Sequence, residues 1–255
     1  SISFPSVPTL HLPTTLQSLK AVHCEDLVLD GTEYLTSLTW IDCSIPFPSC
    51  PNLQSLCLET PGEEDDLSFL RDMTTVTDLS ITSPSTGILS SVAPNVVALR
   101  LFVTKDHQPF ESEMLSPLTQ LTALSLFMYE QLEGFDLSPL TTLQRLHLSR
   151  LPIKALPSSL VQCTMTVTDE IDLSSLTRLS SLAIECHIDA NVTFPTQLAR
   201  LTVSRLLPES NISQVNLKTL LCDLLLPLCP FQMDQLPPSV RSSMSIYPET
   251  SQPLF

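Results

Sequence analysis

The stretches Leu16-Gln-Ser-Leu19-Lys-Ala21, Leu35-Thr-Ser-Leu38-Thr-Trp40 and Leu53-Gln-Ser-Leu56-Cys-Leu58 share one frame, L-x-x-L-x-L. The frame starts again, with some substitutions, at Val76, Val96, Leu121, Leu143, Leu160, Leu179, Leu198, Leu217 and Val240. Successive starts are 17 residues (143 to 160) to 25 residues (96 to 121) apart. A unit of this length cannot bury its apolar side chains alone. The repetition therefore predicts an elongated stack in which neighbouring units complete each other's core.

Within each frame the apolar residues fall at fixed positions, numbered from the first leucine. Leu16, Leu19 and Ala21 occupy positions 1, 4 and 6 of the first frame, and Lys20 occupies position 5. Successive residues of a strand point to opposite faces. We predict that positions 1, 4 and 6 face the core and that positions 3, 5 and 7 face the open side. Twelve such strands in parallel would form a sheet along one face of the stack.

The segments that lead from one strand to the next are of two kinds. One kind carries Leu-Pro or Phe-Pro, at Leu12-Pro13, Leu156-Pro157, Phe194-Pro195 and Leu236-Pro237. Proline fixes φ and lacks an amide donor, so we expect extended or polyproline-like backbone there. The other kind reads Leu-Ser-Pro-Leu or Leu-Ser-Ser-Leu and starts at Leu115, Leu137 and Leu173. This pattern favours a single helical or 3-10 turn.

Along almost its full length the chain resembles the leucine-rich repeat superfamily. Its Leu-Pro returns are similar to those of small proteoglycans and some bacterial effector proteins. Its Leu-Ser-Pro-Leu returns are similar to those of internalins and of the repeat subunit that regulates a protein phosphatase. The resemblance implies an α/β solenoid, a curved stack with a parallel β-sheet on the concave face and mostly irregular or 3-10 returns on the convex face.

The chain departs from the common pattern of that superfamily at position 9. This position lacks Asn and holds Cys24, Cys43, Pro61, Pro84, Thr104, Tyr129, Leu151, Thr168, His187, Leu206, Leu225 and Pro248. The sequence therefore lacks a continuous ladder of side chains that would hydrogen-bond the polar groups of the loop backbone. We expect an irregular, unevenly curved stack.

The continuous repeats predict a single domain over residues 1–255. Residues 1–15 would form an N-terminal cap or partial repeat, residues 16–247 about twelve repeats, and residues 248–255 a C-terminal tail. Two stretches exceed a bare repeat, the acidic loop Pro61–Asp66 and the polar loop Thr104–Glu113. Inserted loops often carry function, and solvated surface turns explain both equally well.

The charge of the chain bears on the class of its partner. The net charge is −15, and there are only 12 Lys plus Arg. Nucleic acid is disfavoured as principal ligand, because phosphate binding depends on basic side chains that displace counterions. The most apolar segment, near residues 220–228, is shorter than the roughly 20 residues of a membrane-spanning helix. We therefore expect another protein as partner and no membrane insertion.

The eight cysteines fit reduced thiols better than a disulfide framework. Cys24 and Cys43 lie at position 9, and no tight cysteine cluster flanks the repeats. We expect mostly buried thiols and a cytoplasmic protein, with a disulfide at Cys50 or Cys229 left open. The alternative is a secreted or cell-surface protein. The sequons Asn191-Val-Thr193 and Asn211-Ile-Ser213 would then be glycosylation sites.

The sequence carries no pattern that points to catalysis or to a bound ion. Four glycines in the whole chain exclude a glycine-rich phosphate loop. The two His/Cys doublets, His23-Cys24 and Cys186-His187, are far apart, and adjacent strand residues point to opposite faces. We predict no enzyme activity, no catalytic residues, no cofactor and no metal site.

Function is then expected on the open face of the strands. The candidate partner-binding residues combine aromatic and Met side chains with basic ones, a composition typical of interface hot spots. They are Arg100, Phe102, Val103, Phe127, Met128, Arg145, His147 and Arg150. Alternatively, Phe102 and Phe127 lie beneath the loop at 104–113 and widen the core.

These residues predict a non-enzymatic protein–protein interaction module. It would bind a partner on the concave face or rim, as a scaffold, a regulator or a subunit of an assembly. The alternative is a secreted or cell-surface recognition protein, such as an adhesin or receptor ectodomain. A regulator that supplies an arginine to a partner's catalysis ranks last, because no loop arginine stands out. The sequence identifies neither the partner nor the oligomeric state.

Overall fold

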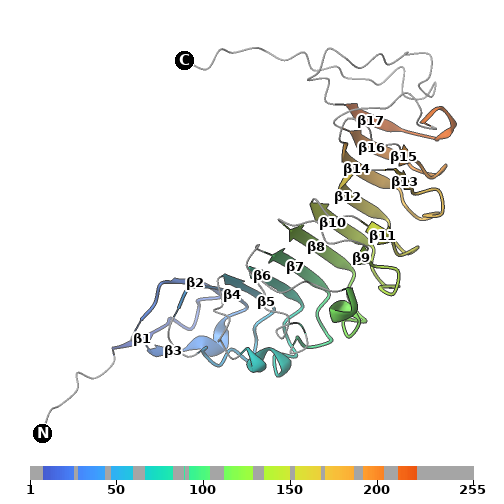
Figure 1. The fold of residues 1–255 in the computed structure, drawn as a ribbon. Coiled ribbons are helices and arrows are strands. Elements are labelled where there is room, and N and C mark those ends of the chain that lie inside the picture. The colour runs from blue at the N-terminus through green and yellow to red at the C-terminus, as the bar shows by residue number, and fades with distance from the viewer. Residues whose placement is uncertain are drawn as a thin grey trace, which may run out of the picture. The chain divides into compact units, whose positions relative to one another are not determined.

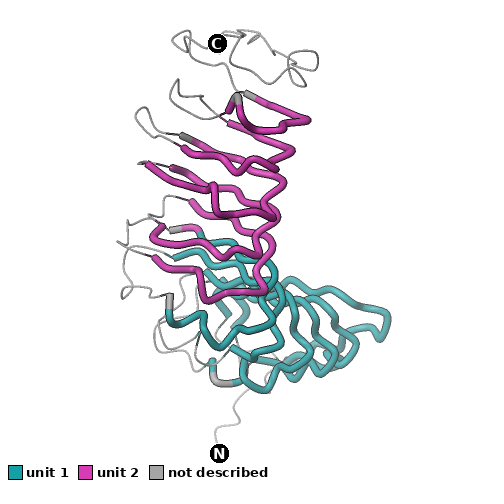
Figure 2. The backbone as a smooth tube through the Cα atoms, turned by 90° about the vertical axis from the view of Figure 1, so that its right-hand side faces the viewer, with its two compact units in different colours: residues 1–126 teal, residues 127–255 magenta. Residues whose placement is uncertain are grey.

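A computed structural model of the protein describes most of the chain. The described residues are 8–25, 28–43, 47–59, 67–82, 89, 92–103, 112–128, 135–149, 153–167, 170–186, 192–203 and 212–222. The chain forms two compact units, residues 1–126 and 127–255 (Figure 2). Each unit is described by itself, and the single domain and its outer boundaries stay predictions.

The first unit is built on parallel strands that coincide with the repeat frames (Figure 1). They are β2 (Ser18–Val22), β4 (Ser37–Ile41), β5 (Ser55–Glu59), β6 (Asp78–Thr82) and β7 (Ala98–Val103). β8 (Ala123–Met128) holds the next frame. The strands pair position for position, so that the position-4 residues align as Leu19, Leu38, Leu56, Leu79 and Leu99.

The second unit repeats this arrangement. Its frame strands are β10 (Arg145–Ser149), β12 (Gln162–Val167), β14 (Ser181–Cys186), β16 (Arg200–Val203) and β17 (Thr219–Cys222). They are parallel, and their position-4 residues align as Leu146, Cys163, Leu182, Leu201 and Leu220. Every frame from Leu16 to Leu217 thus holds a strand, and the frame at Val240 lies outside the described residues.

Burial follows the predicted pattern. In the second frame Leu35 and Leu38 are fully buried, and Trp40 is 8% exposed. Cys163 and Met165 take the inward positions 4 and 6 of their frame and are equally buried. The first frame is the exception, because Leu16 and Leu19 are only half-buried at the end of the stack. The prediction of a parallel-sheet solenoid is confirmed, and its curvature and concave face stay predictions.

Both kinds of return end in the same turn. The position-1 amide donates to the carbonyl oxygen three residues earlier, as from Leu16 to Pro13 (2.9 Å) and from Leu143 to Leu140 (3.0 Å). The Leu-Ser-Pro-Leu returns place a second such bond one turn before, from Leu140 to Leu137 (3.0 Å). The predicted single turn is confirmed. It is a 3-10-type turn, because each bond spans three residues.

An aspartate caps two of these turns. The Asp136 carboxylate accepts the Ser138 amide at 2.8 Å, and Asp172 accepts the Ser174 amide at 2.9 Å. Hydrogen bonds from the serine hydroxyl and amide lower the pKa of each exposed carboxyl below its ordinary value of 3.8. The stabilisation is therefore present above that ordinary pKa and is lost as the pH falls through the lowered one.

The returns also contain short parallel strand pairs that the sequence did not predict. β1 (Thr9–His11) pairs with β3 (Val28–Asp30), β9 (Phe135–Asp136) with β11 (Ile153–Ala155), and β13 (Ile171–Asp172) with β15 (Val192–Thr193). Three of these strands directly precede the described Leu-Pro and Phe-Pro segments, which confirms extended backbone beside the prolines. Strands of two or three residues are too short to show a periodic pattern.

Helix is scarce among the described residues. The 3-10 helices are η1 (Thr32–Tyr34), η2 (Ser68–Arg71), η3 (Ser112–Leu115) and η4 (Ile212–Gln214). Apart from these single turns, only Leu89 has helical conformation in the part of the chain that is described. The predicted irregular or 3-10 returns fit this structure, and the α/β label does not. None of the described helices is long and apolar enough to cross a membrane.

The cysteines whose side chains are described are free thiols of different exposure. Cys50 and Cys163 are buried, whereas Cys24, Cys43 and Cys57 are half-buried. Burial raises the pKa of Cys50 to about 11 and that of Cys163 to about 12. Cys229, the other residue at which a disulfide was left open, lies outside the described residues.

Truncating a buried frame residue should destabilise the protein far more than truncating an exposed one in the same repeat. Leu146 is 3% exposed, so Leu146→Ala should lower the free energy of unfolding by about 2–5 kcal/mol. Gln144 is exposed, and Gln144→Ala should change it by less than about 0.5 kcal/mol. Denaturant unfolding of both variants measures the difference, and equal effects would contradict the stacked core.

Thiol alkylation should follow the exposure of the cysteines. Iodoacetamide reacts with the thiolate, so the buried Cys50 and Cys163, with raised pKa values, should react last at neutral pH. Cys24 and Cys43 should react before them. Timed alkylation followed by peptide mass spectrometry gives the order, and early labelling of Cys163 would contradict the packing of β12.

Candidate functional site

The open face of the second unit carries small side chains in register. At position 5 the strands align His147, Thr164, Ala183, Thr202 and Leu221. Thr166 and Glu185 align two residues further along β12 and β14. The middle strands therefore offer short polar or apolar side chains, with larger groups at the two ends of the row.

These small residues leave a hollow of about 350 Å³ on the strand face. Its lining comes from positions 5 to 7 of four neighbouring strands, and consists of His147, Leu148, Ser149, Thr164, Met165, Thr166, Ala183, Ile184, Glu185, Thr202 and Val203. Leu148, Met165, Ile184 and Val203 occupy position 6 and turn their side chains to the core, so they contribute strand backbone to the floor of the hollow. The hollow thus combines a backbone floor with hydroxyls, the Ala183 methyl group, an imidazole and a carboxylate.

An aromatic contact lies at one end of the hollow. The Phe127 ring centroid is 4.8 Å from that of His147, with an interplanar angle of 39°. This separation lies in the range of favourable aromatic pairs. Phe127 and His147 are both half-buried, so the rings are neither fully exposed nor part of the closed core. Two of the predicted site residues are brought together here.

Two exposed arginines lie along the same face. Arg145 and Arg200 occupy position 3 of β10 and β16, with Gln162 and Ser181 between them in register. Three strand steps separate them, or about 14 Å at the usual strand spacing. Both arginines are exposed, so they are available at the edge of the face that holds the hollow.

The remaining predicted site residues differ in how far their side chains are exposed. Arg100 is exposed on β7, and Phe102 is half-buried on the same strand. Val103 is only 7% exposed, so its prediction as a surface residue is wrong. It occupies position 8, where the β7 strand continues and turns the side chain back to the core. The side chain of Met128 and all of Arg150 lie outside the described residues, as do the loops at 61–66 and 104–111.

Arg100 lies in a second row of mostly small side chains. Position 5 of the first unit aligns Lys20, Thr39, Cys57, Ser80 and Arg100. Burial is the main cause that raises the pKa of the Cys57 thiol, and the positive charges of Arg100 and Lys20 oppose it. Between Lys20 and Arg100 the row therefore carries small, uncharged side chains.

Two histidines of the described residues each lie close to an aspartate. His23 Nδ1 lies 3.0 Å from Asp42 Oδ2, and His11 Nδ1 lies 2.8 Å from Asp30 Oδ2. No group of three or more His, Cys, Asp or Glu residues within the described ranges could hold a metal ion. The doublet at Cys186-His187 lies partly outside those ranges.

The hollow itself was missed from the sequence. Thr164, Thr166, Ala183, Glu185 and Thr202 line it and were not among the candidate residues. The available signal was the run of small residues at position 5 in three consecutive frames. The sequence analysis searched for large aromatic and basic side chains, and so overlooked the space that small ones leave.

The sequence matches no protein-family model and no curated protein. Among solved structures, the chain is similar to internalin C2 from Listeria monocytogenes strain 4b F2365. The identity is 16%, over 84% of this chain and 80% of that chain, with a TM-score of 0.33. A likeness of this size carries no argument about the protein. The fold is assigned from the chain's own repeat frame, from the register of its parallel strands and from its buried leucines. These features identify the fold as a leucine-rich repeat solenoid with repeats of uneven length.

Proposed function

We propose that the protein is a non-enzymatic interaction module that binds a partner protein on the open face of its frame strands. The observation that carries the proposal is the hollow beside the Phe127–His147 ring pair. Its floor is strand backbone held by sheet register on both sides, so it is formed before a partner arrives. A preformed surface loses little conformational entropy on binding.

The chemistry of the hollow favours a protein segment as its occupant. The small side chains leave room for a side chain of the partner beside the Ala183 methyl group, and Thr164, Thr166 and Thr202 offer hydroxyls to backbone amides and carbonyls. Glu185 can accept a basic side chain at the far edge. Aromatic groups surrounded by polar ones are typical of interface hot spots.

The exposed arginines would orient the partner. Arg145 and Arg200 lie on the position-3 edge, so a partner with carboxylates at that edge and a basic group near Glu185 would fit in one direction. Charges at an interface rim contribute more to orientation and association rate than to affinity. In the first unit, Arg100 and the half-buried Phe102 are a second candidate contact, proposed independently.

A cytoplasmic setting belongs to the same proposal. It is supported by the five cysteines whose side chains the structure describes, which are free thiols. The sequons at Asn191 and Asn211 lie outside the described residues. Mass spectrometry of protein from its native source tests the compartment. A glycan at either asparagine would overturn the cytoplasmic proposal and favour the secreted or cell-surface alternative.

Filling the hollow should abolish partner binding without unfolding the protein. Ala183 is half-buried at the centre of the position-5 row, so Ala183→Trp should block a partner segment. Thr177→Trp places the same side chain at an exposed position of the return that leads into the same strand, and is the matched control. Co-purification from the native source, quantified for both variants and the unmodified chain, gives the result. Equal recovery of the same partner by all three would contradict the proposed site.

The arginines should control the salt dependence of binding. If Arg145 and Arg200 contact carboxylates, affinity should fall as salt rises, because exposed charge pairs are screened beyond about 8–10 Å. The double variant Arg145→Gln, Arg200→Gln should bind more weakly at low salt and show a flatter salt dependence. Titration calorimetry with the captured partner at several salt concentrations measures this. An unchanged slope would place the arginines outside the contact.

A further inference from the structure

The hydrogen-bond ladder between the first two frame strands continues past their ends. The last registered pair is Val22 and Ile41. Beyond it, the His23 amide donates to the Ile41 carbonyl at 2.9 Å, and the Asp42 amide donates to the Glu59 carbonyl at 3.3 Å. The residues that follow the two strands are therefore still held side by side.

The first residue after each strand has an unusual backbone conformation. His23 has φ 49° and Asp42 has φ 45°, both in the left-handed region that residues other than glycine rarely adopt. The two occupy the same position of consecutive repeats, and His23 Nδ1 is hydrogen-bonded to Asp42 Oδ2 at 3.0 Å. A costly conformation that recurs at equivalent positions with a contact between them is typical of a functional constraint.

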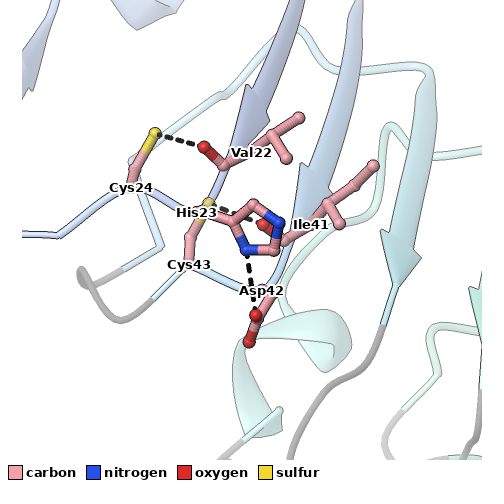
Figure 3. A network of polar contacts seen from close by, with 6 residues as sticks. All are labelled: Val22, His23, Cys24, Ile41, Asp42 and Cys43. Atoms are coloured by element: carbon pink, nitrogen blue, oxygen red, sulfur yellow. Dashed lines mark hydrogen bonds and ion pairs between the residues drawn. The ribbon is translucent and has the colours of Figure 1, made fainter.

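This backbone turn sets the direction of the cysteine that follows in each repeat. The Cys24 thiol donates to the Val22 carbonyl at 3.7 Å, and the Cys43 thiol donates to the Ile41 carbonyl at 3.2 Å (Figure 3). Each thiol thus points to the carbonyl two residues before it. The two side chains have the same arrangement on neighbouring rungs of the stack.

The two cysteines also lie on neighbouring rungs of the stack. Each directly follows one residue of the hydrogen-bonded pair His23 and Asp42, so the register of the two strands places Cys24 beside Cys43. Neighbouring strands are about 4.8 Å apart, and disulfides join residues whose Cα atoms are about 4.4–6.8 Å apart. Both thiols are half-buried, so a small oxidant can reach them.

We propose that Cys24 and Cys43 are a reversible redox pair that forms a disulfide between the first two frames of the stack when the protein meets a disulfide oxidant such as glutathione disulfide. The thiolate of one cysteine attacks a sulfur of the oxidant and displaces one glutathione thiolate. The second cysteine thiolate then attacks the resulting mixed disulfide and displaces the other glutathione. Two protein thiols are oxidised, and one glutathione disulfide is reduced to two glutathione molecules.

The cross-link would act on a frame whose apolar side chains are poorly buried. Leu16 and Leu19 of the first frame are only half-buried, and Leu10, Val22 and Val28 are exposed nearby. A bond from Cys24 to Cys43 ties this poorly buried frame to the second one, in which Leu35 and Leu38 are fully buried. Oxidation should therefore suppress the separation of the first repeat from the stack.

The test uses the full chain, equilibrated with glutathione disulfide, alkylated and digested without reduction. Cleavage after Glu25 and Glu33 separates Cys24 from the peptide that carries Cys43, Cys50 and Cys57. Fragmentation of the cross-linked pair then identifies the partner of Cys24. We expect a Cys24–Cys43 link that disappears after dithiothreitol and that is lost in Cys24→Ser and in Cys43→Ser.

Cys57→Ser is the matched control, since Cys57 is half-buried but lies at position 5 of β5. This variant should keep the cross-link. Oxidation should also slow proteolysis within residues 8–25 severalfold in the unmodified chain and in Cys57→Ser, and should have no such effect in Cys43→Ser. A Cys24 link to another cysteine, or mixed disulfides with glutathione that never resolve to Cys24–Cys43, would overturn the proposal. Circular dichroism of each serine variant verifies that it has folded.

Discussion

The structure depends on the burial of one repeat's aliphatic side chains against those of the next. Positions 1, 4 and 6 of a frame offer too little apolar surface to form a core within one repeat. Leu38 and Leu56 become almost fully buried because the strands that carry them pair in register. A slip by one residue would turn the whole set toward solvent. Register and core therefore specify each other, and the uneven repeat lengths are absorbed by the returns.

The return turns explain how such different segments can fit one stack. Pro13, Leu140 and Pro195 differ in chemistry, yet each offers its carbonyl to the position-1 amide three residues later. A return of any sequence can lead into a frame strand if it ends in this turn and has a buried residue on either side of the turn. Strand pairs and 3-10 turns occur in short as well as long returns, since β11 lies in the shortest repeat, from Leu143 to Leu160. Variation in length is thus confined to segments that do not enter the sheet.

The sequence predicted the frame strands because their pattern is repeated eleven times in the described part of the chain. A repeated pattern can still be recognised when one position is substituted, as with Cys163 in place of leucine. It also predicted the extended Leu-Pro returns, since proline restricts its own backbone. It could not predict the return strand pairs, which depend on contacts between returns 19 residues or so apart, as in Thr9 with Val28. Val103 was misplaced because the strict alternation was stopped at position 7, whereas β7 continues for one more residue.

The same reasoning explains why the candidate site differs from the predicted patch. Large aromatic side chains are easily recognised in a sequence, whereas a binding hollow forms where the side chains are small. Ala183 and Thr202 leave space because their side chains are small, and the His147 and Phe127 rings pack together at one end of the hollow. Since sheet register fixes which residues share a row, the alignment of position 5 across frames contains this information. A row of small residues bounded by larger ones therefore identifies a hollow in a solenoid more directly than a search for exposed aromatic residues. The first unit contains a comparable row, Thr39, Cys57 and Ser80 between Lys20 and Arg100, and its bounding residues are cations in place of aromatic rings.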